Sequence, residues 1–223
     1  MARRIVVTSG KGGVGKTSIA ANLGIRLAKS GKRVCIMDAD FGLNNLDVVT
    51  GVEKLVVYDA ADCVEGRCRV KQALIECPSN KNVYILPSVH SIARTAINEK
   101  TIGELTEGLS TMFDYVVVDC PAGVNEGFSL AVSLSEEALV VTTPQLSSLR
   151  DADKVISLLR GYGLKSVRLI VNRVRGDLVA EGDMLSPEEI EKALKCHLAG
   201  VIPDDDNVFL RNAGLIPSDS PSF

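Results

Sequence analysis

A glycine-rich segment near the N-terminus constrains this chain more than any other feature. It reads Ser-Gly-Lys-Gly-Gly-Val-Gly-Lys-Thr over residues 9–17 and follows the short apolar run 5–7. The apolar residues of 19–28 recur at helical spacing, so the segment joins a buried strand to a helix. In that context the spacing is the pattern of a phosphate-binding loop. A glycine-rich turn that only connects the two elements is the alternative interpretation.

The residue types in this loop indicate how it would hold a nucleotide. Glycines let consecutive backbone N–H groups turn toward phosphate oxygens, and the helix N-terminus adds the positive end of its dipole. Lys16 would neutralise the β- and γ-phosphates, and the Thr17 hydroxyl would ligate Mg²⁺. Lys11 is not needed to hold one nucleotide, so it is either a solvated charge or a group that acts elsewhere.

Apolar strands alternate with helices along the chain. We expect further strands at 33–37, 83–87, 115–119, 138–143, 167–171 and 198–202, and helices at 99–112, 147–159 and 186–196. Short helical pieces are expected at 57–64 and 70–75, and a loop at 41–55. This alternation predicts an α/β fold: one domain over residues 1–223 with a mostly parallel, twisted sheet and helices on both faces.

Local signals predict where two of the helices begin and end. Ser147 or Ser148 is expected to cap the helix over 147–159, and Gly161 to close it. Ser186 with Glu189 three residues later is the pattern of a capping box, a strong helix start.

Composition narrows the functional classes. The net charge of −3 gives no general attraction to nucleic acid. The six cysteines form no C-x-x-C pair and the two histidines complete no ligand cluster, so we expect reduced thiols. Only three apolar residues follow the basic start of the chain, too few for a signal peptide, and no segment approaches a membrane span. We therefore expect a cytoplasmic protein.

Carboxylates follow two of the predicted strands. Asp38 and Asp40 come after the strand at 33–37, and Asp119 ends the strand at 115–119. Ligands of parallel sheets bind beyond the carboxyl ends of the strands, so these side chains should meet the glycine loop at one edge. Asp119 is placed like a Walker-B carboxylate that holds Mg²⁺, and Asp38 and Asp40 can orient water or bond a metal-bound water. The alternatives are that Asp119 is an ordinary turn residue at the end of its strand and that Asp38 and Asp40 are solvated loop residues.

Three motifs together resemble the deviant-Walker-A ATPases, the ParA/MinD family of SIMIBI-type P-loop NTPases. They are Lys-Gly-Gly-Val-Gly-Lys-Thr at 11–17, Asp-Ala-Asp at 38–40 and Asp-Cys-Pro-Ala-Gly at 119–123. Further matches, to the division-site-selection branch typified by MinD, lie at 40–47, 57–59, 65–74, 147–153 and 182–186. The resemblance covers residues 3 to about 208.

The resemblance implies roles for individual residues. Lys11 corresponds to a signature lysine that crosses an ATP-bound dimer to the partner's phosphates, and Asp40 to the carboxylate that positions the attacking water. The implied catalytic residues are Lys11, Lys16 and Asp40, and the residues around Mg²⁺ are Thr17, Asp38 and Asp119. Gly123 lies in the segment that senses the γ-phosphate. Asn172 would read the adenine edge, and Pro203 lies in the segment that closes over the base. Together the loop and the resemblance give a nucleotide-binding set of Gly10, Lys11, Gly12, Gly13, Val14, Gly15, Lys16, Thr17, Ser18, Asn172 and Pro203.

The resemblance also implies an activity and partners. We expect a Mg²⁺-dependent ATPase that binds ATP and ADP and forms an ATP-dependent homodimer. It would take part in division-site selection with a MinC-like inhibitor and a MinE-like activator, and no nucleic-acid partner is expected. The helix that carries Asp151 and Asp153 resembles a partner-binding surface. Its alternative is a solvated helix start whose acidic residues face the positive dipole end.

The chain departs from the family at its C-terminal end. Family members continue into another helix and a basic amphipathic segment that binds the membrane. Here the match fades after Val208, and the last residues are polar. Either the sequence is truncated, or the protein is a divergent member that stays soluble or borrows a membrane partner. Peripheral attachment to the inner face of the membrane is expected only if that tail exists natively.

Three other functions compete with this interpretation. A flagellar-number regulator of the same subfamily would share the mechanism and differ in its partner. A ParA-like partition protein would need a basic stripe to bind DNA, and the acidic balance argues against one. An iron–sulfur carrier would need cluster ligands, and Cys120 lies outside the positions where the family has them.

Overall fold

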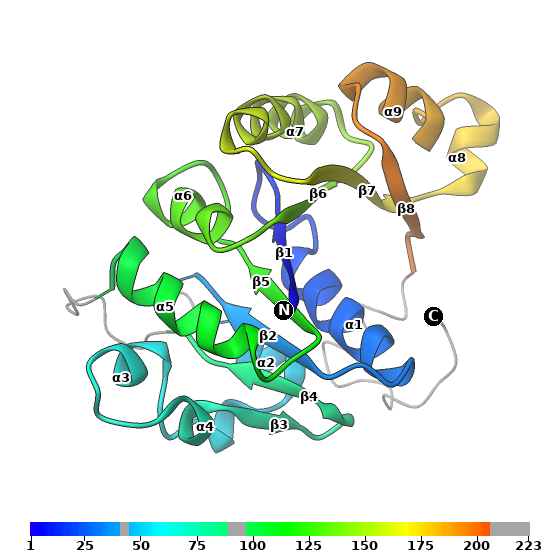
Figure 1. Ribbon diagram of the computed structural model, residues 1–223. Coiled ribbons are helices and arrows are strands. Elements are labelled where there is room, and N and C mark those ends of the chain that lie inside the picture. The colour runs from blue at the N-terminus through cyan, green and yellow to red at the C-terminus, as the bar shows by residue number, and fades with distance from the viewer. Residues whose placement is uncertain (41–44, 89–96, 206–223) are drawn as a thin grey trace.

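A computed structural model describes residues 1–40, 45–88 and 97–205 of the chain (Figure 1). Its strands form one sheet in the order β3-β4-β2-β5-β1-β6-β7-β8. Neighbouring strands are parallel except for β3, which pairs antiparallel with β4 at one edge. The strands are β1 (Arg3–Thr8), β2 (Val34–Asp38), β3 (Ile75–Cys77), β4 (Asn80–Leu86), β5 (Tyr115–Asp119), β6 (Glu137–Thr142), β7 (Ser166–Val174) and β8 (Leu198–Pro203).

Helices cover both faces of this sheet (Figure 1). Val6 of β1 packs in one hydrophobic core with Phe128, while its neighbour Val7 packs in a second core with Ile19. Successive strand residues therefore point to opposite, buried faces, which confirms the predicted α/β architecture. The helices are α1 (Lys16–Lys29), α2 (Leu46–Thr50), α3 (Ala60–Val64), α4 (Val70–Ala73), α5 (Glu99–Ser110), α6 (Glu126–Ser133), α7 (Leu146–Leu159), α8 (Gly176–Glu181) and α9 (Pro187–Leu194).

Several short elements were not predicted from the sequence. These are β3, α6 and α8, and also α2 and a 3-10 turn (Glu53–Leu55), which lie inside the segment expected to be a loop. Each is eight residues or fewer, too short for apolar periodicity to be distinguished from chance. Residues 41–44 of the predicted loop lie outside the described residues. The expected loss of the family's C-terminal helix and tail concerns residues 206–223, which also lie outside them.

One predicted helix cap is confirmed. Ser186 caps α9: its hydroxyl accepts a hydrogen bond from the Glu189 backbone N–H at 3.2 Å, and the Glu189 carboxylate accepts one from the Ser186 N–H at 2.8 Å. These two reciprocal bonds satisfy backbone donors that the start of a helix leaves unpaired, as the capping-box pattern predicts.

The predicted capping residues of α7 are wrong, although its predicted span of 147–159 agrees with the observed Leu146–Leu159 to within one residue. The helix begins earlier, at Leu146 with Gln145 as the N-cap, so Ser147 and Ser148 lie inside its first turn and bond to other elements. At its C-terminal end α7 runs into a 3-10 turn (Arg160–Tyr162) that contains Gly161. The residue in the left-handed conformation that ends this turn is Gly163, with φ of 67°.

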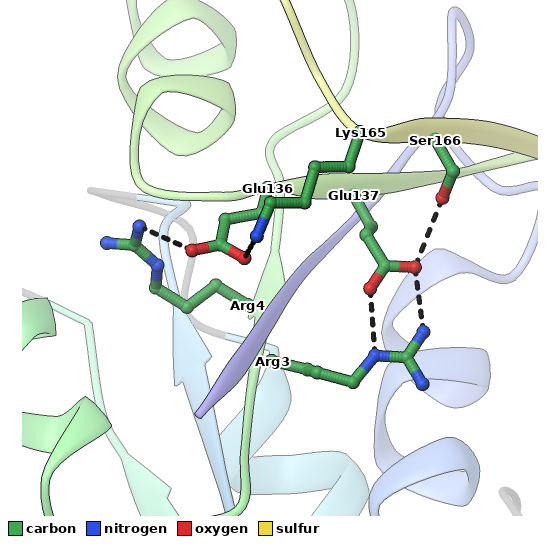
Figure 2. A network of polar contacts seen from close by, with 6 residues as sticks. All are labelled: Arg3, Arg4, Glu136, Glu137, Lys165 and Ser166. Carbon is green, nitrogen blue, oxygen red and sulfur yellow. Dashed lines mark hydrogen bonds and ion pairs between the residues drawn. The ribbon is translucent and has the colours of Figure 1, made fainter. Parts of the chain in front are cut away.

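The strand ends away from the glycine loop are held by an ion-pair network (Figure 2). It joins the beginnings of β1, β6 and β7, whose side chains form the pairs Arg3–Glu137 at 2.8 Å, Arg4–Glu136 at 3.0 Å, Lys165–Glu136 at 2.7 Å and Ser166–Glu137 at 3.1 Å. These groups are partly solvent-exposed, so each pair contributes about 1 kcal/mol or less. The network links the amino-terminal ends of these three neighbouring strands. It lies away from the carboxyl ends, where the glycine loop is.

Candidate functional site: a phosphate-binding loop beside buried carboxylates

The glycine loop connects β1 to α1 in a conformation that only glycine adopts easily. Gly13 and Gly15 have φ angles of 77° and 99°, in the left-handed region. Gly15 is the N-cap of α1, and no side chain caps the helix there. The first backbone N–H groups of α1 are therefore left for a ligand, and the positive end of the helix dipole favours an anion.

Two neighbours hold the loop in place. The Asn172 side chain at the end of β7 donates a hydrogen bond to the Val14 carbonyl at 2.8 Å. On the other side, Gly10 lies so close to α7 that an added Cβ would overlap the backbone of Asp151. In the structure, the Asn172 side chain thus supports the loop. Its expected contact with adenine stays a prediction.

Replacing Gly10 by alanine is therefore expected to destabilise the protein. The new methyl group would force α7 away from the loop, an overpacking that costs about 1–3 kcal/mol. Gly12→Ala is the matched control, because the nearest atom to its added Cβ is the Ala122 Cβ at 3.9 Å. Thermal unfolding without nucleotide measures the difference. Equal midpoints for the two variants would contradict the packing described here.

Lys16 is buried, with 8% of its surface exposed. Removal from water lowers the pKa of its ammonium group, while the carboxylates of Asp119 and Asp40 act in the opposite direction. The structure thus brings together a cation at the start of α1 with carboxylates from the ends of β5 and β2. Its predicted contact with the β- and γ-phosphates stays a prediction.

Asp38 and Asp119 are register neighbours at the carboxyl ends of β2 and β5, and both are buried. Asp38 accepts hydrogen bonds from the backbone N–H groups of Asp40 at 2.9 Å and Leu46 at 3.4 Å. Burial raises its pKa to about 8, with a further contribution from the Asp119 charge. Burial also raises the pKa of Asp119 to about 6, although a hydrogen bond with Thr17 and the charge of Lys16 lower it.

This donor set fits a magnesium ion held partly through water. One carboxylate oxygen of Asp119, Oδ1, is buried without a hydrogen-bond partner, and native structures rarely leave such atoms unsatisfied. The Thr17 hydroxyl lies beside the same carboxylate. Mg²⁺ prefers one or two protein oxygens and keeps several waters. Within the described ranges, no group of three or more His, Cys, Asp or Glu side chains could bind a metal directly.

The raised carboxyl pKa values predict that the nucleotide-free protein loses stability as pH rises. Above pH 4 the unfolded chain has released these protons, whereas the folded protein retains one on Asp38 up to pH of about 8. The free energy of unfolding then falls by at most about 1.4 kcal/mol per pH unit for this proton. We expect a lower thermal midpoint at pH 8 than at pH 6. Asp38→Asn should flatten this slope, and Glu104→Gln on the exposed face of α5 should not; equal slopes in both variants would contradict the assignment.

Lys11 and Asp40 lie closer to solvent than Lys16. The Lys11 ammonium group is exposed and donates a hydrogen bond to the Ser147 hydroxyl of α7 at 3.2 Å. Asp40 is partly buried, which raises its pKa, and its carbonyl accepts a hydrogen bond from the Ser88 hydroxyl at 3.0 Å. Because Lys11 lies on the surface beside α7, its charge is available to another molecule.

Asn172 and Pro203 lie on the adjacent strands β7 and β8. The register of this pair shifts between Val171 and Val174, and Arg173 within the shift has a positive φ of 59°. Beyond Pro203, the Asp204 N–H bonds to the Val174 carbonyl at 3.0 Å. This bulge changes the direction of the end of β7. Neither the bulge nor the hydrogen bond between Lys11 and Ser147 could be predicted from a local sequence pattern. The placement of Pro203 over a base stays a prediction.

The fold and the loop define the class of protein. A P-loop NTPase is an α/β protein in which a glycine-rich phosphate loop joins a strand to a helix and carboxylates follow at the ends of later strands. A ParA family model described as NUBPL iron-transfer P-loop NTPase matches residues 1–180. The septum site-determining protein MinD of Bacillus subtilis is 46% identical over 93% of this chain and 78% of its own. That of Thermotoga maritima is 42% identical over 97% and 81%.

Solved structures give the same result. The MinD chain of a MinC:MinD cell division complex from Aquifex aeolicus has a TM-score of 0.87 and 41% identity, over 96% of this chain and 86% of that one. MinD from Pyrococcus horikoshii with Mg-ADP has a TM-score of 0.84 and 32% identity, over 97% and 87%. The chain belongs to the septum site-determining MinD family of ParA-type P-loop NTPases. Across its described residues, no helix has the length and apolar character needed to cross a membrane.

Proposed function

We propose that this protein is a Mg²⁺-dependent ATPase that acts as a dimerisation switch in division-site selection. The observation that carries the ATPase assignment is the group formed by the buried Lys16 and Asp119 and the partly buried Asp40 beside the phosphate loop. The relatives' names and the MinC:MinD and Mg-ADP complexes support the role in septum placement and the nucleotide. No similar observation favours an iron carrier, because Cys120 is buried and burial raises its pKa to about 12.

Each site residue has a distinct part in this proposal. Lys16 and the N–H groups of the loop hold the β- and γ-phosphates, and Thr17 with the buried carboxylates holds Mg²⁺ and its waters. Asp40, at the more open end of the group, orients the water that attacks the γ-phosphate. Phosphoryl transfer needs little beyond this positioning and charge neutralisation.

The surface around Lys11 suits a second copy of the chain. Leu146 at the start of α7 is 78% exposed, and Val124, after the Asp119 strand, is 51% exposed. Both are apolar side chains in segments that follow the carboxyl ends of β5 and β6, the end of the sheet that carries the loop. Gly123 beside Val124 has a φ of 87°, so a turn that only glycine adopts easily links the carboxylate strand to this surface. In the dimer, Lys11 would release Ser147 and reach the partner's phosphates.

Binding of a division inhibitor tests this proposal. The protein with Asp40→Ala, loaded with ATP or with ADP, is mixed with the MinC-type inhibitor of the same genome, and complex formation is followed by gel filtration. We expect a complex with ATP only. Asp153→Ala on α7 should weaken it, whereas Glu104→Ala on α5 should not. Equal binding with ADP, or none with ATP, would remove the inhibitor from the proposal. A MinE-type activator is expected to bind the same ATP-bound form.

The proposed switch works in the cytoplasm. Attachment to the inner face of the membrane is proposed only for a chain that carries the family's basic amphipathic tail.

A further inference from the structure

Two cysteines far from the glycine loop lie within contact distance of each other. Cys63 is in α3 and Cys68 is in the turn that leads to α4, and their Sγ atoms are 3.5 Å apart. Both are partly exposed to solvent. The remaining thiols are buried; they are Cys35, Cys77, Cys120 and Cys196.

The backbone around the two thiols is held in one arrangement. Asp59 and Asp62 form a capping box at the start of α3, with hydrogen bonds of 2.9 and 3.0 Å. The Asp62 carbonyl then accepts hydrogen bonds from the N–H groups of Arg67 at 2.8 Å and Cys68 at 3.4 Å. The Arg67 side chain completes the turn with a 2.6 Å ion pair to the Asp62 carboxylate. Asp62, the third residue of α3 and one half of the capping box, therefore also positions Cys68 beside Cys63.

We propose that Cys63 and Cys68 are an oxidisable pair that closes to an intramolecular disulfide when the protein meets a hydroperoxide. A disulfide needs an S–S distance of about 2.05 Å, so the two sulfurs must approach by about 1.5 Å. Only the short turn between α3 and α4 has to adjust. Disulfide formation takes place in a surface segment and requires no movement of the strands of the sheet.

The reaction has two steps. Burial and the hydrogen bond with Cys68 raise the pKa of Cys63, so the first attack is assigned to Cys68. Its thiolate attacks one oxygen of the hydroperoxide and the O–O bond breaks. The other oxygen leaves as water or alcohol, and Cys68 becomes a sulfenic acid. The Cys63 thiol then attacks that sulfur, the S–S bond forms, and the hydroxyl leaves as water with the Cys63 proton. Two electrons pass from the two sulfurs to the peroxide, and a thiol reductant reverses the step.

Peptide mapping of the full-length protein tests the proposal. Fully reduced protein is treated with hydrogen peroxide, the remaining thiols are alkylated, and the chain is digested with trypsin without reduction. We expect two of the six thiols to be lost, with a mass decrease of about 2 Da per chain. Trypsin cuts after Lys54, Arg67 and Arg69, so the bridge appears as fragment 55–67 joined to the dipeptide 68–69. A reductant should separate the two.

Variants make the test specific. Cys68→Ser should slow thiol loss at least tenfold and leave Cys63 open to alkylation, while the control Cys196→Ser should form the bridge at the wild-type rate. The proposal is overturned if peroxide leaves both thiols alkylatable, if the linked fragments contain another cysteine, or if chains are joined to one another instead. The wild-type map decides the question even if a variant fails to fold.

Discussion

Lys16→Ala is expected to weaken nucleotide binding by roughly 100-fold or more. In the proposed site this buried side chain supplies a desolvated charge to the β- and γ-phosphates, whereas Lys11, the other cation of the loop, is exposed. Hydrogen bonds to charged groups contribute about 1.5–3 kcal/mol each, and loss of two corresponds to a decrease in affinity of roughly 100-fold or more. Equilibrium titration with a fluorescent ATP analogue measures the change, and hydrolysis should fall to background.

A stability measurement separates this effect from misfolding. Burial of Lys16 costs desolvation, and its attraction to Asp119 and Asp40 offsets that cost, so the nucleotide-free variant should unfold within a few degrees of wild type. Lys29→Ala, at the exposed end of α1, is the control for charge removal and should bind normally. A Lys16→Ala protein that binds ATP within threefold of wild type would contradict the phosphate role.

Asp40→Asn is expected to lower the turnover number by about 100-fold or more while nucleotide affinity stays within a few fold. The substitution keeps the shape of the side chain and the backbone bond from Ser88, and it removes the charge that we propose orients the attacking water. Because that charge acts on the transition state, kcat should fall and KM should not rise. Steady-state phosphate release measures both constants.

The matched control for this variant is Glu104→Gln, which makes the same change on an exposed face of α5. It should leave kcat unchanged. If Asp40→Asn retains kcat within threefold of wild type, another group orients the water. An equal loss in affinity and turnover would instead assign Asp40 to binding.

The glycine loop and the carboxylates could be predicted from the sequence because each follows directly from local rules. Strand, glycine spacing and helix are adjacent in the chain, and the parallel sheet brings strand-terminal residues such as Asp38 and Asp119 to one edge. The long apolar runs of β5 and β6 likewise leave little choice of structure. Their predicted positions agree with the observed strands to within one residue at each end.

The contacts that shape the site could not be predicted in this way. Lys11 and Ser147 are 136 residues apart, and Asn172 and Val14 are 158 apart. Such pairs depend on how α7 and β7 lie beside the loop, which no periodicity reports. The wrong cap for α7 has the same origin, since Ser147 and Ser148 bond to Lys11 and Thr143 and do not cap the helix. The bulge at Arg173 is set by pairing with β8 and has no local signal.

We propose that ATP joins two copies of this chain through Lys11. Sedimentation velocity of the Asp40→Ala protein with saturating ATP and Mg²⁺ tests it most directly, because blocked hydrolysis holds the nucleotide state. We predict a dimer with ATP and a monomer with ADP, and a monomer that still binds ATP when Lys11→Ala is added. A protein that stays monomeric with ATP at high concentration, or a dimer that is indifferent to Lys11→Ala, would contradict the account.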